Sequence, residues 1–448
     1  MGSDYDVIVA GAGLAGVCAA AAAARAGANT LVIEKEAFAG GVSTAGIETS
    51  ICNYFHNAKR DQVVAGIPAE LIGRMVERGG VSGNWYKHRG HVVFDVEIGK
   101  LCMDEIMEEA GADILYGTLI TDALTRGNTV RGVAAANRSG LREYTAGCVV
   151  DATGDADVAV RAGIPLHTAP NEHSILFRIG NVDTDAMMDY FRANPDQYIT
   201  GFDISMTFDE FISFYEDTGI AFFNHGCGRK MKIIQDAVAR GDIPEPYGPF
   251  KRMYAFQMHA MRSNSTMIIN TGFFKMKEPD GREISDILRR GRKLAHLVAE
   301  FMRRDFPGCG NSFVIATSSA PGLRRTRYLK TDYTMTREIY DQGPVYGDRI
   351  GRGVVVEKSE LRVTDRTFDI PLRSVVPPEY EGLIMGSGRS ASCVPAELFR
   401  TMPVTMNLGQ GAGTAAAVAA GTGTSLHALD MSAVHRELEK EGALIRDT

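Results

Sequence analysis

The stretch of sequence that decides the fold is DVIVAGAGLAGVCAAAAAARAGANTLVIE, residues 6–34. It opens with a β-branched run that stops at Gly11, as a buried parallel strand does. The alanine-rich segment Leu14–Ala26 is expected to form a helix that Gly27 ends. Residues 30–33 have the composition of a second strand. The stretch therefore predicts a strand–turn–helix–strand unit and an α/β fold.

A glycine motif, Gly11-Ala-Gly-Leu-Ala-Gly16, lies between the predicted strand and helix. Gly11 permits a tight turn, Gly13 lets the backbone approach a pyrophosphate, and Gly16 packs the helix against the strand. The start of the helix supplies N–H donors and a positive dipole to the phosphates. Glu34 ends the second strand, where an acid binds the ribose hydroxyls and disfavours the 2′-phosphate of NADP. Because these elements occur in register, they predict a dinucleotide site rather than a plain glycine-rich turn.

Two later segments bear on which dinucleotide is bound. Gly40 and Gly41 follow the acid and suit a flavoprotein in which the chain folds back over its cofactor. The segment Asp151-Ala-Thr-Gly-Asp155 can supply a second backbone turn at the adenosine end, although a plain strand-to-helix turn is the alternative. Three such elements in this order are hard to explain with NAD alone. FAD is therefore the predicted cofactor.

The length of 448 residues exceeds what one hydrophobic core usually supports, so two domains are expected. Residues 114–150 predict several short strands with tight turns, and residues 167–346 are richer in aromatic residues, Met and Arg. The predicted fold class is α/β, with a Rossmann-like FAD-binding domain containing a β-meander and an inserted α+β substrate or cap domain. The expected FAD-binding parts are residues 1–166 and 347–448, and the cap domain is 167–346.

Composition excludes several classes of function. The net charge of −7 argues against nucleic acid as the main partner. No charged segment precedes an apolar run, and the longest apolar stretch is far short of a membrane span, so we expect a cytoplasmic protein. None of the seven cysteines pairs at C-x-x-C spacing, which removes dithiol, zinc-ribbon and iron–sulfur signatures. His88, His91 and His173 have no metal-like partners in spacing and are expected to be surface or packing residues, so no metal is predicted.

The chain resembles the FAD-dependent oxidoreductase family of the glutathione-reductase type, and more distantly the fumarate-reductase-type flavoproteins. The resemblance spans nearly the whole chain. The matching stretches are Gly11–Gly16 with Glu34, Gly40-Gly41, Gly66–Pro68, Asp95–Glu97 with Lys100, Asp151–Asp157, Pro321–Arg327 with Tyr333 and Thr336, Gly388-Arg389, Arg400–Pro403 and Gly409–Gly413. The residues expected to contact FAD are Gly11, Gly13, Leu14, Ala15, Gly16, Glu34, Lys35, Gly40, Gly41, Ile120, Ala152, Thr153, Gly154, Gly388, Arg389, Thr401, Met402 and Val404.

The resemblance implies that the C-terminal block returns to the flavin. Thr401 can cap a helix over residues 403–420 in which the early Pro403 lacks only an N–H that would be unpaired anyway. The start of this helix would face the N1/O2 edge of the flavin and stabilise the anionic reduced ring. The three glycines of segment 409–413 would let the helix pack tightly, and a purely structural small-residue helix is the alternative.

Candidate catalytic residues follow from hydride transfer between a substrate and flavin N5. Arg400, Arg324 and Arg327 can grip a substrate carboxylate, although each is equally suited to a structural ion pair. His56 is the candidate general base, with His225 and His259 as competitors.

We therefore expect an FAD-dependent dehydrogenase or reductase acting on a small organic molecule, with a carboxylate-bearing substrate as one option. An O2-using monooxygenase or oxidase is the alternative, but Gly386-Ser-Gly-Arg389 stands where an aromatic hydroxylase has a Gly-Asp-Ala-Ala-His-type segment. A disulfide reductase would need a second dinucleotide fold and paired cysteines. A flavin-holding or RNA-modifying module is disfavoured by the acidic charge balance. The electron acceptor or donor and the oligomeric state stay open, with a homodimer as one option.

Overall fold

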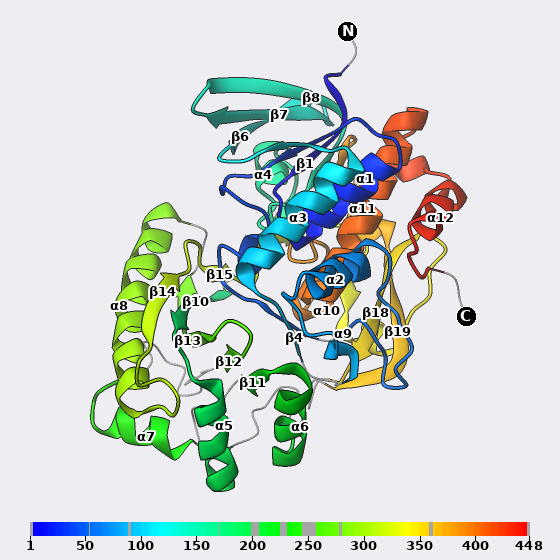
Figure 1. The fold of residues 1–448 in the computed structure, drawn as a ribbon. Coiled ribbons are helices and arrows are strands. Elements are labelled where there is room, and N and C mark those ends of the chain that lie inside the picture. Colours follow the sequence, from blue (N-terminus) through cyan, green and yellow to red (C-terminus); the bar gives the residue numbers. More distant parts are fainter. Residues whose placement is uncertain are drawn as a thin grey trace.

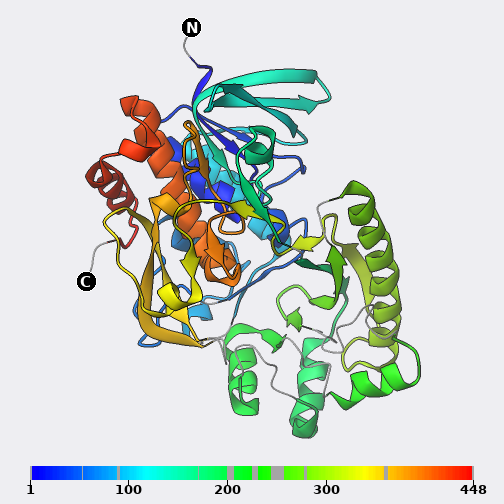
Figure 2. The ribbon, with the colours of Figure 1, turned by 180° about the vertical axis from the view of Figure 1, so that it is seen from behind.

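The computed structural model describes residues 3–52, 54–87, 91–169, 171–198, 206–224, 231–243, 257–276, 280–357 and 362–445. Its elements form two lobes (Figure 1). The N-terminal segments, drawn in blue and cyan, form the first lobe together with the orange and red C-terminal segments. The green middle of the chain forms the second lobe, also called the green lobe. The view from behind shows the same division (Figure 2).

The strands of this part of the chain are β1 (Tyr5–Ala10), β2 (Thr30–Ile33), β3 (Ser50–Cys52), β4 (His91–Val93), β5 (Asp113–Leu115), β6 (Leu119–Arg126), β7 (Thr129–Asn137), β8 (Gly140–Asp151), β9 (Leu166–Thr168), β10 (Asn171–Gly180), β11 (Ile220–Phe223), β12 (Gln257–Met261), β13 (Thr266–Met276), β14 (Phe313–Thr317), β15 (Gly322–Leu323), β16 (Arg327–Leu329), β17 (Met335–Thr336), β18 (Arg349–Val356), β19 (Val363–Pro371), β20 (Leu383–Met385) and β21 (Cys393–Val394). The helices are α1 (Leu14–Arg25), α2 (Ile67–Glu77), α3 (Val96–Ala110), α4 (Asp157–Arg161), α5 (Thr184–Ala193), α6 (Phe208–Thr218), α7 (Lys232–Ala239), α8 (Gly281–Asp305), α9 (Arg337–Asp341), α10 (Glu397–Arg400), α11 (Met402–Thr422) and α12 (Met431–Lys440).

The first sheet has the strand order β5-β2-β1-β8-β7-β6, with β20 also paired to β8. Strands β5, β2, β1, β8 and β20 run parallel, whereas β6, β7 and the first half of β8 form an antiparallel meander. All four residues of β2 are buried, as expected of a parallel strand covered by helices on both faces. The predicted Rossmann-like unit with a β-meander is confirmed.

Helices α1 and α11 pack against each other in parallel (Figure 1). A Cβ added at Gly409 would lie 2.1 Å from the carbonyl oxygen of Ala15, and one added at Gly413 would lie 2.1 Å from that of Ala19. Residues four apart on one helix therefore meet residues four apart on the other in the same order. Side chains at 409 and 413 would separate the two backbones.

The predicted C-terminal helix is present as α11, but one detail of its start is wrong. Thr401 occupies the N-cap position, yet its side chain makes no capping hydrogen bond. Pro403 lies in the first turn, where its missing N–H costs nothing. The start of α11 thus remains without a side-chain cap.

The second sheet forms the core of the green lobe, with the order β11-β12-β13-β10-β14 and β15 paired to β10. All its pairs are antiparallel. One face, including Met258 and Ile269, shares a hydrophobic core with Phe301 of α8. The opposite face turns toward the first lobe, where Ile268 packs with Ile47. This arrangement confirms an inserted α+β cap.

The expected domain boundaries at residues 166 and 346 stay a prediction. Leu329, Met335 and Tyr340 pack in the core of the first lobe, and the strands of the second sheet lie between residues 171 and 323. Among the described helices, none is both long enough and apolar enough to cross a membrane.

The contact between α1 and α11 leads to a prediction about stability. The substitution Gly413→Ala should lower the free energy of unfolding by about 1–3 kcal/mol, because the added methyl group meets backbone that cannot easily yield. Urea denaturation of both variants measures this. Gly421→Ala, near the exposed end of the same helix where a Cβ meets nothing, is the control and should be neutral or slightly stabilising. Equal stability of the two variants would contradict the close packing.

Candidate cofactor and substrate site

The glycine turn at the start of α1 forms a cradle with open space in front of it. Gly11 has φ +94°, and a Cβ there would lie 2.9 Å from the carbonyl oxygen of Ala152. A Cβ at Gly16 would lie 1.9 Å from the carbonyl oxygen of Gly11, which forces glycine at this point of the helix. A Cβ at Gly13 would meet nothing within 4 Å. Gly13 is the N-cap residue, and no side chain caps the helix.

The start of α1, with Leu14 and Ala15, is therefore free of competing side chains and carries no acidic residue in its first turn. Such a helix end attracts an anion through its N–H groups and its dipole. The geometry suits the diphosphate of a dinucleotide.

Glu34 lies at the end of β2, against this turn, and is buried. Its Oε2 accepts a hydrogen bond from the N–H of Ala12 at 2.7 Å, and its Oε1 accepts one from the N–H of Glu36 at 2.9 Å. Burial raises the pKa of this carboxyl, and the two backbone donors oppose that rise. The carboxylate is thus fixed in one position, and each oxygen keeps a further lone pair for a ribose hydroxyl.

Two of the other residues predicted around the nucleotide, Gly40 and Gly41, pack directly on the glycine turn, and no contact with the turn is seen for Lys35 and Ile120. Gly40 folds the chain back over the turn, because its N–H donates to the carbonyl oxygen of Ala12 at 2.7 Å, and a Cβ at Gly41 would lie 3.1 Å from Cα of Gly13. Lys35 is exposed beside Glu34, and Ile120 is buried on β6.

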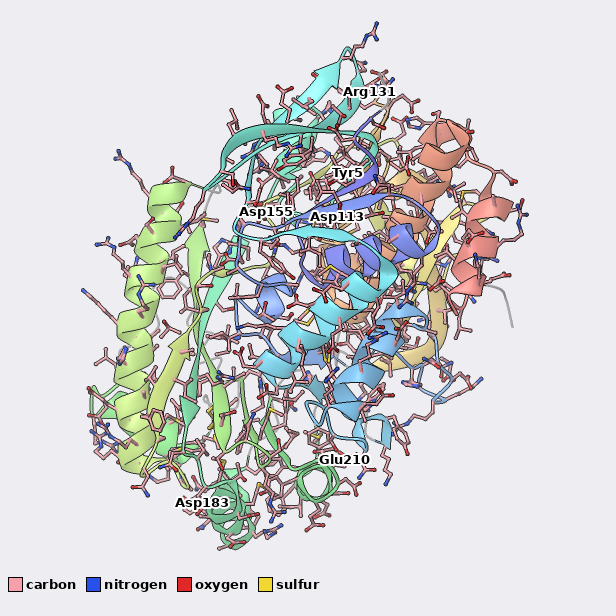
Figure 3. The ribbon with its side chains drawn as sticks, turned by 45° about the horizontal axis from the view of Figure 1, so that its top comes forward. Tyr5, Asp113, Arg131, Asp155, Asp183 and Glu210 are labelled. Carbon is pink, nitrogen blue, oxygen red and sulfur yellow. The ribbon has the colours of Figure 1, made fainter. Side chains whose placement is uncertain are left out.

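The turn after β8 is joined to the C-terminal block by an ion pair. Arg389 Nη2 lies 2.5 Å from Asp155 Oδ1, and the hydroxyl of Thr326 donates to the same oxygen at 2.7 Å. Burial acts to raise the pKa of Asp155, but Arg389 and Thr326 outweigh it and the pKa is lowered. Figure 3 shows Asp155 on the side of the first lobe that faces the second sheet. Sequence reasoning assigned Asp155 to a turn only and missed this pair.

Ala152, Thr153 and Gly154 lie between Asp151 and this ion pair. Asp151 is fully buried and accepts hydrogen bonds from the Thr153 hydroxyl at 2.6 Å and from the N–H groups of Val158 and Ala159 at 3.0 Å. Burial raises its pKa to about 6. A Cβ at Gly154 would lie 3.0 Å from Cζ of Arg389. The structure thus brings the predicted residues 152–154 and 389 together.

Because α1 and α11 are parallel, their N-terminal ends point in the same direction, and the N-terminal end of α11 lies farther along that direction. Met402 lies seven residues before Gly409, whereas Leu14 lies one residue before Ala15, so α11 extends six residues beyond α1. At a rise of about 1.5 Å per residue, the two helix starts are offset by about 9 Å along their shared direction.

The segment before α11 is locked in place. Gly388 N–H donates to the Thr405 hydroxyl at 2.8 Å, and a Cβ at Gly388 would lie 1.9 Å from the carbonyl oxygen of Phe399. Val404 is buried and Met402 partly buried. Gly388, Thr401, Met402 and Val404 therefore surround one uncapped helix start.

Arg400 precedes this helix start and is a cation without an anion. Within the described residues, its guanidinium makes no hydrogen bond or ion pair, although it is partly buried. Burial lowers its pKa, and Glu397 and Cys52 oppose that effect. A partly buried guanidinium that forms no ion pair is a candidate for binding a negatively charged group.

The two other candidate arginines differ from Arg400. Arg327 forms an ion pair with Asp157 at 3.4 Å, which favours the structural alternative, and its substrate contact stays a prediction. The substrate contact of Arg324 also stays a prediction; this residue adds slightly to the effect of burial, which lowers the pKa of the nearby His173 to about 4. Arg325 was missed: it is buried and donates to the carbonyl oxygens of residues 389, 391 and 393 at 2.8, 3.2 and 2.6 Å. Only burial distinguishes it from its neighbours in the sequence.

The candidate histidines lie apart. His56 is partly buried with its ring 5.8 Å from that of Trp85, and burial together with Arg60 lowers its pKa. His259 is buried on β12, and His225 lies outside the described residues. Of the predicted surface or packing histidines, His91 and His173 are buried and His88 is not described. In the described chain, no group of His, Cys, Asp and Glu could hold a metal ion.

These residues fit FAD at two points. The open space at Gly13, with Glu34 beside it, suits the diphosphate and ribose, and the uncapped start of α11 suits a ring that becomes negative on reduction. The helix packing holds both points in one orientation.

Comparison with known proteins agrees with FAD as the cofactor. Residues 6–438 match the model of a family described as FAD dependent oxidoreductase. Digeranylgeranylglycerophospholipid reductase 2 from Methanothermobacter thermautotrophicus is 28% identical over 210 residues, which are 44% of this chain and 53% of that protein. The chain thus covers about half the length of this relative.

Two solved structures were also found. A geranylgeranyl bacteriochlorophyll reductase-like protein from Thermoplasma acidophilum gives a TM-score of 0.45 at 14% identity, with 98% of this chain and 84% of that one covered. L-proline dehydrogenase from P. horikoshii gives a TM-score of 0.44 at 13% identity, with 99% and 100% covered.

The cradle at Gly13 can be tested without disturbing the fold. Gly13→Glu should yield a folded protein that has lost FAD, because the added side chain meets open space in the protein but occupies the place of the diphosphate and repels its charge. Circular dichroism reports the fold and the flavin absorbance reports the cofactor. Gly73→Glu, on an open face of α2, is the control and should keep the flavin. An intact flavin spectrum in the folded Gly13 variant would refute this placement.

Proposed function

This chain belongs to the FAD-dependent oxidoreductase family, and on that premise we propose that it transfers a hydride between a small carboxylate-bearing organic molecule and FAD. Bound FAD supplies a two-electron acceptor or donor at its ring. The residues of the chain hold this cofactor, orient the substrate and shield both from water.

The two parallel helix starts divide the task of holding the cofactor. The N–H groups at the start of α1 bind the diphosphate, and Glu34 accepts hydrogen bonds from the ribose. The start of α11 places a positive dipole against the ring, where it stabilises negative charge. Asp155 and Arg389 tie the two parts of the site together through their ion pair.

Arg400 carries the assignment of a carboxylate substrate. Its guanidinium lies at the start of α11, is partly buried, and has no anion among the described residues. A planar guanidinium can bind a carboxylate through two parallel hydrogen bonds, which fixes the orientation of the substrate as well as its position. An orienting contact beside the ring is what hydride transfer requires.

A neutral histidine is available for the proton that accompanies the hydride. Burial lowers the pKa of His56, so its imidazole is neutral at neutral pH and can accept a proton. We retain His56 as the candidate base, with His259 as its competitor from the second sheet.

The role of Arg400 is tested with the FAD-bound enzyme under anaerobic conditions. Arg400→Ala should keep the flavin spectrum but weaken binding of small carboxylates, followed as a perturbation or bleaching of the flavin, by about 100-fold, since a charged hydrogen-bonded pair is lost. Arg289→Ala, which removes an exposed surface arginine of α8, should leave binding unchanged.

Two results would overturn this proposal. Unaltered carboxylate binding by the Arg400 variant would remove Arg400 from the site. Bleaching of the wild-type flavin by NAD(P)H alone, with no response to any carboxylate, would favour the O2-using monooxygenase.

A further inference from the structure

One face of the second sheet carries polar side chains where it meets residues 49 and 50 of the first lobe. Gln257 and His259 are two residues apart on β12, so their side chains lie on the same face of the sheet. Asn270 on β13 lies directly opposite Gln257, and Phe222 on β11 lies directly opposite His259, so both belong to that face as well. Ile268 of β13 lies directly opposite His259 on this face and packs with Ile47 of the first lobe.

The polar end is held against the strand β3 of the first lobe. Gln257 Nε2 donates to the hydroxyl of Ser50 at 2.7 Å, and that hydroxyl donates to Oε1 of Glu48 at 2.6 Å. Thr49 Oγ1 lies 2.9 Å from Nε2 of His259. Gln257, Ser50 and Thr49 therefore already have partners, and they fix the distance between the sheet and β3.

Two buried polar atoms at this place have no partner. Nδ1 of His259 and Oδ1 of Asn270 make no hydrogen bond with any described residue, although both side chains are only 2% exposed. An unsatisfied polar atom in the interior costs free energy and is rare in folded proteins. Two of them on one sheet face point to a ligand that binds both.

Strand β3 connects this place with the segment that contains Arg400. Ser50 and Cys52 share a face of β3, and they are about 7 Å apart along the strand. Ser50 contacts Gln257, whereas Cys52 is close enough to Arg400 to influence its pKa. Strand β3 is therefore in contact with Gln257 of the second sheet and with α11, the helix that follows Arg400.

We propose that His259 and Asn270 bind a hydroxyl group of the substrate, so that the carboxylate bound by Arg400 is a hydroxy acid. This inference rests on the proposed function. The unpartnered Oδ1 of Asn270 accepts a hydrogen bond, and Nδ1 of the neutral His259 ring donates one when it carries the proton, so a single hydroxyl, which both donates and accepts, satisfies the two atoms. An ammonium group only donates, and burying its charge would require a carboxylate beside it.

Strands β11, β12 and β13 contain no Asp or Glu and so contribute no such carboxylate to this face. The side chains of Gln257, Asn270 and Phe222 carry no charge. His259 is neutral as well, because burial and, to a smaller extent, the neighbouring His91 lower its pKa to about 3. The carboxylate of Glu48 is not free to pair with an ammonium group, because its Oε1 accepts hydrogen bonds from both the hydroxyl and the N–H of Ser50. A hydroxyl therefore suits the site better than an ammonium group.

The test compares three acids of one carbon skeleton on the FAD-bound enzyme without oxygen. Lactate, alanine and propionate, together with their longer homologues up to six carbons, are titrated while the flavin spectrum is recorded. We expect the hydroxy acid of the preferred length to bind at least about tenfold more tightly than the unsubstituted acid, because only the hydroxy acid satisfies the buried pair. Equal affinities, or tighter binding of the amino acid, would overturn the inference.

Two substitutions at one position assign this preference to Asn270. Asn270→Leu should abolish the preference for the hydroxy acid without changing the affinity for the unsubstituted acid. Asn270→Asp has the same shape and adds a negative charge, so it should shift the preference to the amino acid. If the Leu variant does not fold, the Asp variant tests the role of Asn270 by itself. Asn311→Leu, at an exposed site of the same lobe, should behave as the wild type.

The outcomes separate the two proposals. If carboxylates bind in a manner that depends on Arg400 but the hydroxyl makes no difference, only the role of His259 and Asn270 is refuted. If no carboxylate binds, or if binding ignores Arg400, the proposed function itself is refuted.

Discussion

The close parallel contact between α1 and α11 is the constraint on which the rest of the structure depends. Gly409 and Gly413 place the backbone of α11 directly against the carbonyl oxygens of Ala15 and Ala19. Because the helices run the same way, their two N-termini point to one side of the first sheet. One long cofactor with a diphosphate at one place and a ring at another can therefore use both helix ends, although the helices lie almost four hundred residues apart in the sequence.

Polar contacts beside this pair of helices hold in place the loops that would surround the cofactor. The ion pair between Asp155 and Arg389 joins the turn after β8 to the segment before α11, and Arg325 holds that segment through its carbonyl oxygens. Arg400, which follows this segment, forms no ion pair with any described residue. The second sheet contacts β3 through Gln257 and Ser50 and has buried polar groups there, so the proposed substrate binding would use residues of both lobes.

Much of the fold could be predicted from local patterns, because its decisive features lie close together in the sequence. The glycine motif, Glu34 and the small-residue helix α11 each identify themselves within a few residues, and they belong to the most regular part of the structure. The cap for Thr401 was wrong because a suitable residue type does not fix the side-chain geometry. The pairing of Asp155 with Arg389 could not be predicted, since the two residues are 234 positions apart and no local pattern connects them.

The substrate side was harder to predict for the same reason. Arg324, Arg325 and Arg327 are equivalent in the sequence, and only burial shows that Arg325 is structural. His259 and Asn270 become a pair only when the register between β12 and β13 is known. A crystal structure of the protein with FAD tests the central claim most directly. The account predicts diphosphate oxygens within about 3.2 Å of the N–H groups at the start of α1, with the flavin ring against the start of α11. A diphosphate or ring bound away from either helix start would contradict it.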